Sequence, residues 1–339
     1  MPRKPQVCIV TPGTPEANNG NWHTAARWQR LLAPCAQVTV AQAWDHEPAD
    51  LLIALHARRS AESIRRFHAS WPTRPLILVL TGTDLYRDVK QDAGVRRVLD
   101  AATHLVVLQA EALGRLTPGE RRRATVIEQS ATRLIRRDQA RRTFDFVCVG
   151  HLRAAKDPLT LMRATCLLPE RLASGAVPRV LHIGRALAPE FAAAAERTRA
   201  ECGRYRWLGP LPAAAARRTL ARARALIQPS VMEGGALAVI EALRSDVPVL
   251  ASCIDGNVGL LGRDYGGYFP VGDAVALAHV MQRFADEPTF AAHLTAQCRA
   301  RAPRFAPAVE AARLRALLSA ALSTGDAVMR PAVHTPPAA

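Results

Sequence analysis

The chain of 339 residues has no run of about 20 apolar residues, the length that a helix needs to cross a bilayer. The apolar run near the N-terminus, residues 7–10, is also too short for the hydrophobic region of a signal peptide. We therefore expect a cytoplasmic protein with no stable membrane association.

Cysteine pairs with metal-binding or disulfide spacing are also missing. The seven cysteines are odd in number and scattered, and no two have the spacing C-x-x-C. This pattern argues against a disulfide framework and against a zinc site. We expect reduced cysteines that serve as small core residues.

Lysine and aromatic residues are scarce although the net charge is +16. Only Lys4, Lys90 and Lys156 are lysines, so arginine supplies nearly all the positive charge in a composition that looks biased. Few of these basic residues alternate with aromatic ones, and we expect no nucleic-acid partner. A nucleic-acid-binding protein is the alternative from another class, and salt-dependent retention on DNA without nucleotide-sugar binding would favour it.

Short β-branched or apolar runs alternate with amphipathic stretches, which predicts parallel, doubly wound sheets. Expected strands are 7–11, 38–41, 51–55, 76–80, 105–108 and 125–127, then 146–149, 180–183, 225–228, 249–251 and 268–271. Expected helices are 24–32, 61–68, 159–168, 213–224, 236–244, 277–286 and 308–322. The arginine-rich segment 133–143 separates two halves, so we predict an N-terminal domain over 1–140 and a second domain over 141–305. A helix over 306–324 is expected to pack back on the first domain, followed by a disordered tail, 325–339.

The segment 228–252, QPSVMEGGALAVIEALRSDVPVLAS, is the most informative one. It is typical of a strand, a glycine-rich turn, a helix and another strand. Gly234 and Gly235 allow a ligand to approach the backbone, and the free N–H groups at Ala236 and Leu237 favour a phosphate. In a simpler alternative, Glu233 complements the helix dipole and Glu241 is solvated.

The same segment resembles the C-terminal domain of GT4-type retaining glycosyltransferases, in which two glutamates are spaced as E-x7-E. The resemblance implies the α/β GT-B architecture, with two Rossmann-like doubly wound parallel-sheet domains facing a central cleft. It also implies that Glu233 and Glu241 bind hydroxyl groups of a nucleotide sugar. Asp246 stands where these enzymes often have glycine.

Residues 149–158, VGHLRAAKDP, resemble the family segment V-G-R-L-x-x-x-K-G, whose basic residues hold the donor diphosphate. This likeness assigns Gly150 and Lys156 to the donor site. His151 replaces the family arginine, and the nearby Arg153 is positioned to substitute for it. The alternative for Lys156 is an ordinary surface lysine.

Two further segments with glycine and asparagine match family loops. Asn257 lies in a segment that resembles the last donor-binding loop, and Gly20 and Asn21 lie where the family has a glycine loop that lines the cleft. A plain flexible loop is the alternative for the N-terminal segment.

The segment LTGTDLYRD, residues 80–88, resembles the family pattern T-x-H-G-x-D, with Thr81 in place of the histidine. Without that histidine an acceptor hydroxyl lacks a group that positions or deprotonates it, so an acceptor that is already ionised is favoured. Arg58 and Arg59 are adjacent and follow a predicted strand, which suits a phosphate-like dianion. A solvated helix start is the alternative interpretation for these two arginines. The predicted acceptor-binding residues are His56, Arg58, Arg59, Thr81, Gly82, Thr83 and Arg87.

Taken together, the motifs of residues 6–320 resemble the SenB family of selenosugar synthases of selenoneine biosynthesis. The resemblance implies that selenophosphate attacks the anomeric carbon of a UDP-sugar, expected to be UDP-N-acetylglucosamine (UDP-GlcNAc), and expels UDP. The predicted catalytic residues are Lys156, Glu233, Arg153 and His151. Of these, Lys156 with His151 or Arg153 is expected to stabilise the leaving diphosphate, together with the helix start at Gly234 and Gly235. No D-x-D sequence occurs, so we expect no cofactor and no metal.

The nearest alternative is a GT4-type enzyme that transfers a sugar to a hydroxyl of a sugar or lipid in cell-envelope glycan synthesis. Such an enzyme would rest on an anionic membrane through basic residues of its N-terminal domain. Thr81 and the lack of a conspicuous basic amphipathic helix argue against it.

Overall fold

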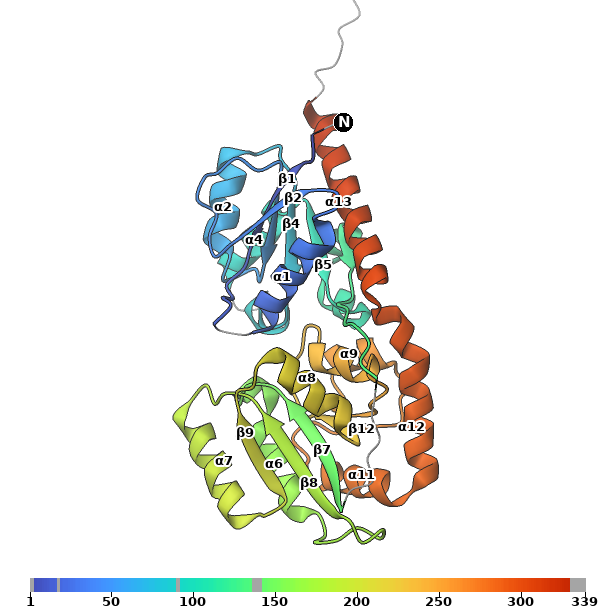
Figure 1. Cartoon of the computed structure of the whole chain (residues 1–339). Helices are drawn as coiled ribbons and strands as arrows, with labels where there is room; N and C mark the ends of the chain where they lie inside the picture. The colour runs from blue at the N-terminus through green and yellow to red at the C-terminus, as the bar shows by residue number, and fades with distance from the viewer. Residues whose placement is uncertain (1–2, 17–18, 90–91, 136–141, 330–339) are drawn as a thin grey trace, which may run out of the picture. The chain divides into compact units, whose positions relative to one another are not determined.

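The computed structural model describes residues 3–16, 19–89, 92–135 and 142–329, with side chains up to residue 323. Figure 1 labels its main helices and strands. The chain divides into two compact units. The first contains residues 1–108, 113–127 and 311–339, and the second contains residues 109–112 and 128–310.

The first unit is built on a six-stranded parallel sheet in the order β2-β1-β3-β4-β5-β6. Strands β3 and β4 are buried along their whole length, which explains their unbroken apolar sequences. The strands are β1 Gln6–Val10, β2 Gln37–Ala41, β3 Leu51–Leu55, β4 Leu76–Leu80, β5 His104–Val107 and β6 Ala124–Val126. The helices are α1 Gly20–Leu32, α2 Ala61–Ser70, η1 Asp84–Asp88, α4 Ala93–Ala101 and α5 Pro118–Arg122. Helices η2 Ala110–Arg115 and α13 Pro307–Met329 cross the unit boundary, and α13 belongs to the first unit from Ala311 onward.

The second unit is a six-stranded parallel sheet in the order β12-β11-β10-β7-β8-β9. Its strands are β7 Thr143–Val149, β8 Val177–Ile183, β9 Tyr205–Gly209, β10 Ala225–Gln228, β11 Val249–Ser252 and β12 Tyr268–Phe269. Its helices are η3 Ala154–Lys156, α6 Pro158–Leu167, α7 Pro189–Glu201, α8 Ala213–Arg222, α9 Leu237–Leu243, α10 Asp255–Leu261, α11 Ala274–Asp286, α12 Pro288–Arg301 and η4 Ala302–Phe305. The predicted α/β class with two parallel sheets is confirmed.

In each sheet the strand order reverses beside the first strand, between β1 and β3 and between β7 and β10. Crevices at such points, outside the carboxyl ends of the strands, are where ligands bind in open α/β sheets. The segments singled out in the sequence follow β3, β4, β7 and β10. The topology therefore places them at the carboxyl edges of their own sheets.

One strand and several α-helices were absent from the sequence-based prediction, namely β9, α4, α5, α7, α10 and α12. Strand β9 lies at the edge of its sheet and alternates between less and more exposed positions, so it has no apolar run. Helix α10 contains Gly256 and Gly259, residues that are unfavourable in helices. A Cβ atom at Gly256 would lie 2.3 Å from the Glu233 carbonyl oxygen, so close packing explains this glycine.

The C-terminal helix α13 packs in the core of the first unit through Leu314, Leu317, Leu318 and Ala321. The Arg315 guanidinium also donates to the Leu31 carbonyl oxygen at 3.0 Å. The helix continues to Met329, so residues 325–329 of the segment expected to be a disordered tail are helical. The boundary expected after residue 140 also differs, since residues 128–135 belong to the second unit.

Ion pairs and hydrogen bonds explain why residues 128–135 join the second unit. Glu310, at the start of α13, is buried and accepts hydrogen bonds from the Ser130 backbone N–H, at 2.9 Å, and from the Ser130 hydroxyl. Arg304 pairs with the buried Glu128.

No helix in the described part of the chain has both the length and the apolar character needed to cross a membrane.

Candidate functional site

The central feature of the second unit is a contact between Lys156 and Glu233. Lys156 ends the short helix η3 after β7, and Glu233 lies in the turn after β10, the strand that pairs with β7. Lys156 Nζ donates to Glu233 Oε1 at 2.5 Å, and the two side chains are 21% and 8% exposed. Two residues 77 positions apart thus form one charged pair at the carboxyl edge of the sheet.

Glu233 is held by two further side chains, one from the end of β10 and one from the turn that follows it. Gln228 Nε2 and Ser230 Oγ each donate to Glu233 Oε1 at 2.6 Å, and Gln228 also donates to Ser230 Oγ at 3.0 Å. All three donors, including Lys156, meet the same oxygen. Among the described residues none donates a hydrogen bond to the other oxygen, Oε2. The carboxylate is therefore fixed through one oxygen and has capacity for a hydroxyl of a ligand at the other.

The glycine-rich turn at Gly234 and Gly235 leads into α9, which has seven residues and begins at Leu237. Ala236 occupies the N-cap position and provides no side chain that could cap the helix. The first backbone N–H groups of α9 therefore have no capping side chain, which leaves them available to a bound anion. Because α9 is so short, these N–H groups would contribute more to the binding of an anion than a helix dipole would.

Asn257 lies in the first turn of α10 and not in the loop that the sequence predicted. Its side chain is fully buried, and Nδ2 donates to the Ser252 carbonyl oxygen at 2.9 Å and to Ser252 Oγ at 3.2 Å. Ser252 Oγ in turn donates to the Ser230 carbonyl oxygen. In this structure Asn257 supports the turn that carries Glu233.

Glu241, the second glutamate of the pair, lies on α9 and forms an ion pair with Arg217 of α8, with Nε 3.3 Å from Oε1. Arg217 also donates to the Thr132 hydroxyl at 2.9 Å and to the Thr132 carbonyl oxygen at 2.6 Å. The partner of Glu241 is thus a fixed arginine, which the sequence analysis did not identify.

The remaining predicted donor residues surround Lys156. Gly150 packs against the aliphatic part of Lys156, since a Cβ atom there would lie 3.5 Å from Lys156 Cδ. His151 Nδ1 accepts a hydrogen bond from the Arg185 backbone N–H at 3.2 Å. Arg153 is exposed, and its guanidinium forms no hydrogen bond or ion pair with another described residue. Of these basic side chains, Arg153 is therefore the one with all its donors available.

A buried histidine that the sequence analysis missed interacts with the Gly150 backbone. His182 of β8 is 1% exposed, and its Nδ1 lies 2.8 Å from the hydroxyl of Tyr205. Burial lowers the pKa of His182 to about 4, although a hydrogen bond with the Gly150 backbone acts in the opposite direction. The ring is consequently neutral at physiological pH and supports the Gly150 turn.

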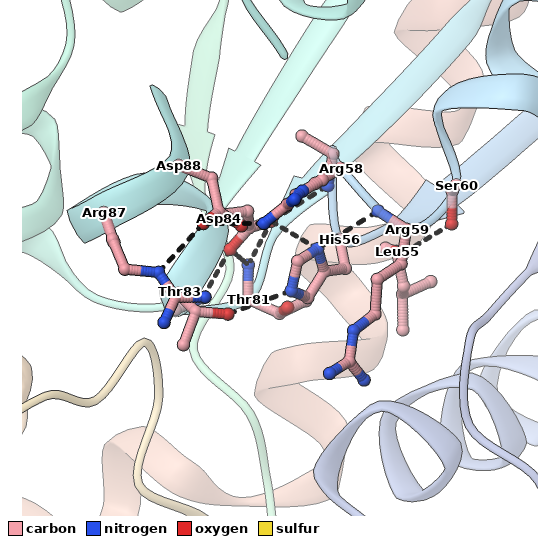
Figure 2. A network of polar contacts seen from close by, with 12 residues as sticks. Leu55, His56, Arg58, Arg59, Ser60, Thr81, Thr83, Asp84, Arg87 and Asp88 are labelled. Carbon is pink, nitrogen blue, oxygen red and sulfur yellow. Dashed lines mark hydrogen bonds and ion pairs between the residues drawn. The ribbon is translucent and has the colours of Figure 1, made fainter. Parts of the chain in front are cut away.

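A second polar cluster lies in the first unit, where β3 and β4 end (Figure 2). The ring of His56 is directed toward Thr83, with Nε2 3.0 Å from Thr83 Oγ1. Asp84 is fully buried and accepts hydrogen bonds from the backbone N–H groups of Ala57 at 3.0 Å, Thr81 at 3.0 Å and Gly82 at 2.7 Å. Asp84 thereby ties the turn after β3 to the turn after β4.

The arginines of this cluster differ in their partners. Arg58 lies 3.8 Å from Asp88 and 3.7 Å from Asp92, and Arg87 donates to Asp88 Oδ1 at 3.0 Å. The guanidinium of Arg59 is exposed, extends away from these carboxylates in Figure 2 and forms no hydrogen bond or ion pair with another described residue. The sequence predicted Arg58 and Arg59 as equal partners for an anion, but the structure leaves only Arg59 of the cluster free of a carboxylate.

Burial lowers the pKa of His56, and Arg59 acts in the same direction, while Asp84 and Asp88 oppose the shift. The side chain is 6% exposed. His56 is therefore neutral near pH 7.

Gly20 and Asn21 differ from their predicted place in a loop, since they form the first turn of α1. Asn19 caps this helix, and its side-chain oxygen accepts from the backbone N–H groups of Asn21 and Trp22, both at 3.1 Å. These two N–H groups are thus already bonded within the first unit.

The fold and the second unit can now be compared with known proteins. Residues 143–287, which form most of the second unit, match the family described as glycosyl transferases group 1. No curated protein sequence matches the chain.

Solved structures resemble the whole fold. HepE from Anabaena in complex with UDP has a TM-score of 0.72 at 15% identity and covers 93% of this chain and 99% of its own. Sucrose-phosphate synthase from Thermosynechococcus elongatus has a TM-score of 0.74 at 18% identity and covers 95% and 100%. The pneumococcal O-GlcNAc transferase GtfA in complex with UDP and GlcNAc has a TM-score of 0.62 at 15% identity and covers 83% and 57%.

These comparisons confirm the predicted GT-B fold. The pair formed by Lys156 and Glu233 lies within the residues of the second unit that match the glycosyl transferases group 1 family.

Proposed function

We propose that this protein transfers a sugar, expected to be N-acetylglucosamine, from a UDP-sugar to selenophosphate. The observation that carries the donor half of the proposal is the carboxylate of Glu233, fixed at one oxygen by Lys156, Gln228 and Ser230. Structures with the same fold contain UDP or, in HepE, UDP-glucose, which supports a UDP-sugar as donor.

In the proposed donor complex, the diphosphate lies at Lys156, Arg153 and the backbone N–H groups that precede and begin α9. Positive charge and N–H groups at this place stabilise the charge that develops on the diphosphate as it departs. Glu233 binds a sugar hydroxyl through Oε2, because a carboxylate that faced the diphosphate directly would repel it. With Glu233 assigned to the sugar, Glu241 is the glutamate that binds the ribose.

The acceptor half rests on the cluster in the first unit. Selenophosphate is ionised and attacks through selenium without loss of a proton to a base. A C–Se bond forms at the anomeric carbon, the C–O bond to UDP breaks, and the electron pair leaves with UDP. The sugar selenophosphate then loses its phosphate, which is replaced at selenium by a proton when water cleaves the P–Se bond. The free guanidinium of Arg59 suits the dianionic acceptor.

One observation favours a second candidate, transfer to a hydroxyl of a sugar or lipid in cell-envelope glycan synthesis. His56 is neutral and hydrogen-bonded to Thr83, so a base is present near the position where Thr81 replaces the family histidine. If a hydroxyl binds at Thr83, His56 could accept its proton through the threonine.

Mass spectrometry of the products separates the two candidates. The protein is incubated in EDTA with UDP-GlcNAc, with and without enzymatically generated selenophosphate. A sugar with the selenium isotope pattern, formed together with UDP, would support the synthase and metal independence. Binding of UDP-GlcNAc without that product would contradict the selenophosphate proposal and leave a hydroxyl acceptor to be identified.

Two controls make the result specific to the site. UDP-glucose in place of UDP-GlcNAc tests the choice of sugar. The Glu233→Gln variant keeps the size of the side chain but removes the charge that Lys156 contacts, and it should lose product formation while the protein remains folded. Product formation at the wild-type rate by this variant would remove Glu233 from the proposed mechanism.

A further inference from the structure

The turn that follows β3 has an unusual backbone at His56. This residue has a φ of 71°, in the left-handed region that non-glycine residues seldom adopt. Such a conformation costs free energy and persists only where the surroundings fix it. Here the Asp84 carboxylate binds the next backbone N–H, at Ala57, and the His56 N–H donates to the Val79 carbonyl oxygen at 2.9 Å. The fold thus holds His56 in a strained geometry that places its ring against Thr83.

The hydrogen bonds around the ring indicate which nitrogen carries the proton. His56 Nδ1 accepts a long hydrogen bond from the backbone N–H of Arg59 at 3.5 Å. The nearest carboxylate oxygen, Asp84 Oδ2, is 4.0 Å from Nδ1, which is too far for a hydrogen bond. That carboxylate already accepts three backbone N–H groups, two of them from Thr81 and Gly82. These contacts favour the neutral ring in which Nδ1 is the acceptor nitrogen and Nε2 bears the hydrogen.

We propose that His56 is a positioning residue, which donates its Nε2–H to Thr83 Oγ1 and thereby directs the Thr83 hydroxyl proton toward an oxygen of an anionic acceptor. A threonine hydroxyl has one proton, and the lone pair that faces His56 is occupied by the donated hydrogen bond. The Thr83 proton then remains available to a ligand that accepts hydrogen bonds, while Arg59 supplies the positive charge.

This arrangement selects between classes of acceptor and rests on the proposed function. An anionic acceptor such as selenophosphate presents ionised oxygen atoms, which accept hydrogen bonds, and it therefore fits a hydroxyl that donates. With the opposite tautomer, Thr83 would donate to His56 and offer only lone pairs, which suits an acceptor hydroxyl and makes His56 a base. The tautomer of one histidine thus distinguishes the two candidate reactions.

The first test uses variants that separate the hydrogen bond from the backbone conformation. His56→Gln carries an amide N–H at about the reach of Nε2. His56→Asn tolerates the left-handed backbone at least as well but is too short to reach Thr83. Thr83→Val removes the hydroxyl at constant shape, and Thr83→Ser restores it.

At saturating UDP-GlcNAc, Thr83→Val and His56→Asn should raise the KM for selenophosphate about tenfold, the effect of losing one hydrogen bond to a charged group. Thr83→Ser and His56→Gln should recover most of that loss. The affinity for UDP should not change, because UDP is assigned to the second unit. An unchanged KM in Thr83→Val, or equal behaviour of the Asn and Gln variants, would overturn the inference.

The second test needs no variant and keeps failure of the inference distinct from failure of the proposed function. Long-range ¹H–¹⁵N correlation spectra of the wild-type protein identify the tautomer of His56. A proton on Nε2 supports the inference, and a proton on Nδ1 overturns it. If the wild-type protein makes no selenosugar, the proposed acceptor is wrong. Calorimetry with thiophosphate then decides the inference alone: binding that weakens in Thr83→Val supports it, and binding that does not weaken, or no binding, overturns it.

Discussion

Replacing Gln228 by methionine tests whether the hydrogen bonds around Glu233 prepare the site for the sugar part of the donor. Gln228 is 1% exposed and donates to Glu233 Oε1 at 2.6 Å. Methionine has nearly the same length and fills the space without a donor. The substitution therefore removes one of three hydrogen bonds from the carboxylate and leaves Lys156 and Ser230 in place.

The magnitude follows from the charge on the acceptor. A hydrogen bond to a charged group contributes about 1.5–3 kcal/mol, so the free energy of unfolding should fall by about 2 kcal/mol. The effect on binding should depend on the ligand. When the diphosphate attracts Lys156, Glu233 relies more on Gln228 and Ser230, so Gln228→Met should weaken binding of UDP-GlcNAc about tenfold more than binding of UDP, a difference of about 1.4 kcal/mol.

Isothermal titration calorimetry with UDP and with UDP-GlcNAc measures this difference directly, and denaturant unfolding measures the stability. Gln109→Met is a matched control, because Gln109 is also fully buried in the second unit but accepts a hydrogen bond from the Ala112 N–H at 3.2 Å. The control should lose stability without any selective loss of UDP-GlcNAc. Equal weakening of both ligands in Gln228→Met would refute the reasoning that Glu233 binds the sugar.

Three further predictions concern other parts of the two units. Arg59→Ala should raise the KM for selenophosphate about tenfold and Arg58→Ala by much less, because of these two arginines only Arg58 has carboxylate partners. Steady-state kinetics that reverse this order would exclude Arg59 as the anion contact. Glu241→Ala should weaken UDP and UDP-GlcNAc by the same factor in calorimetry, since it removes a ribose contact; a loss confined to UDP-GlcNAc would contradict that assignment. Burial lowers the pKa of His182 to about 4 in the folded state. As the pH falls, the unfolded chain therefore binds a proton at this histidine before the folded protein does. The free energy of unfolding should be unaffected by this group above about pH 6.5 and should fall by about 3 kcal/mol as the pH drops to 4. His182→Gln should flatten this part of the stability curve in denaturant titrations, and an unchanged slope would show that other groups are responsible.

Much of the fold could be predicted because the central strands are buried on both faces. Leu51–Leu55, Leu76–Leu80 and Ala225–Gln228 were predicted with the bounds that the structure has. Residues that face helices on both sides of a sheet must be apolar, so such strands are visible as continuous runs. The glycine-rich turn before α9 could also be predicted, because two adjacent glycines between a strand and a helix are a local sequence pattern.

Elements whose stability comes from tertiary packing were missed. Helix α7 is rich in alanine and has one buried side chain, Ala195, so its sequence has almost no amphipathic signal. Helix α10 has two glycines, and each lies against another segment: Gly256 against Glu233 and Gly259 against Gln109. The need for glycine at these two positions is apparent only when the neighbouring segments are known.

The sequence by itself determined the α/β class, the two halves and the residue types of the candidate site, because strand burial, helix periodicity and glycine-rich turns are local patterns. Only the tertiary structure decided the partners. It joined Lys156 to Glu233, and it gave Arg58 a carboxylate but left Arg59 free. It also brought His56 to Thr83. Hydrogen bonds act over about 3 Å, and no local pattern specifies which distant side chains the sheet brings within that range.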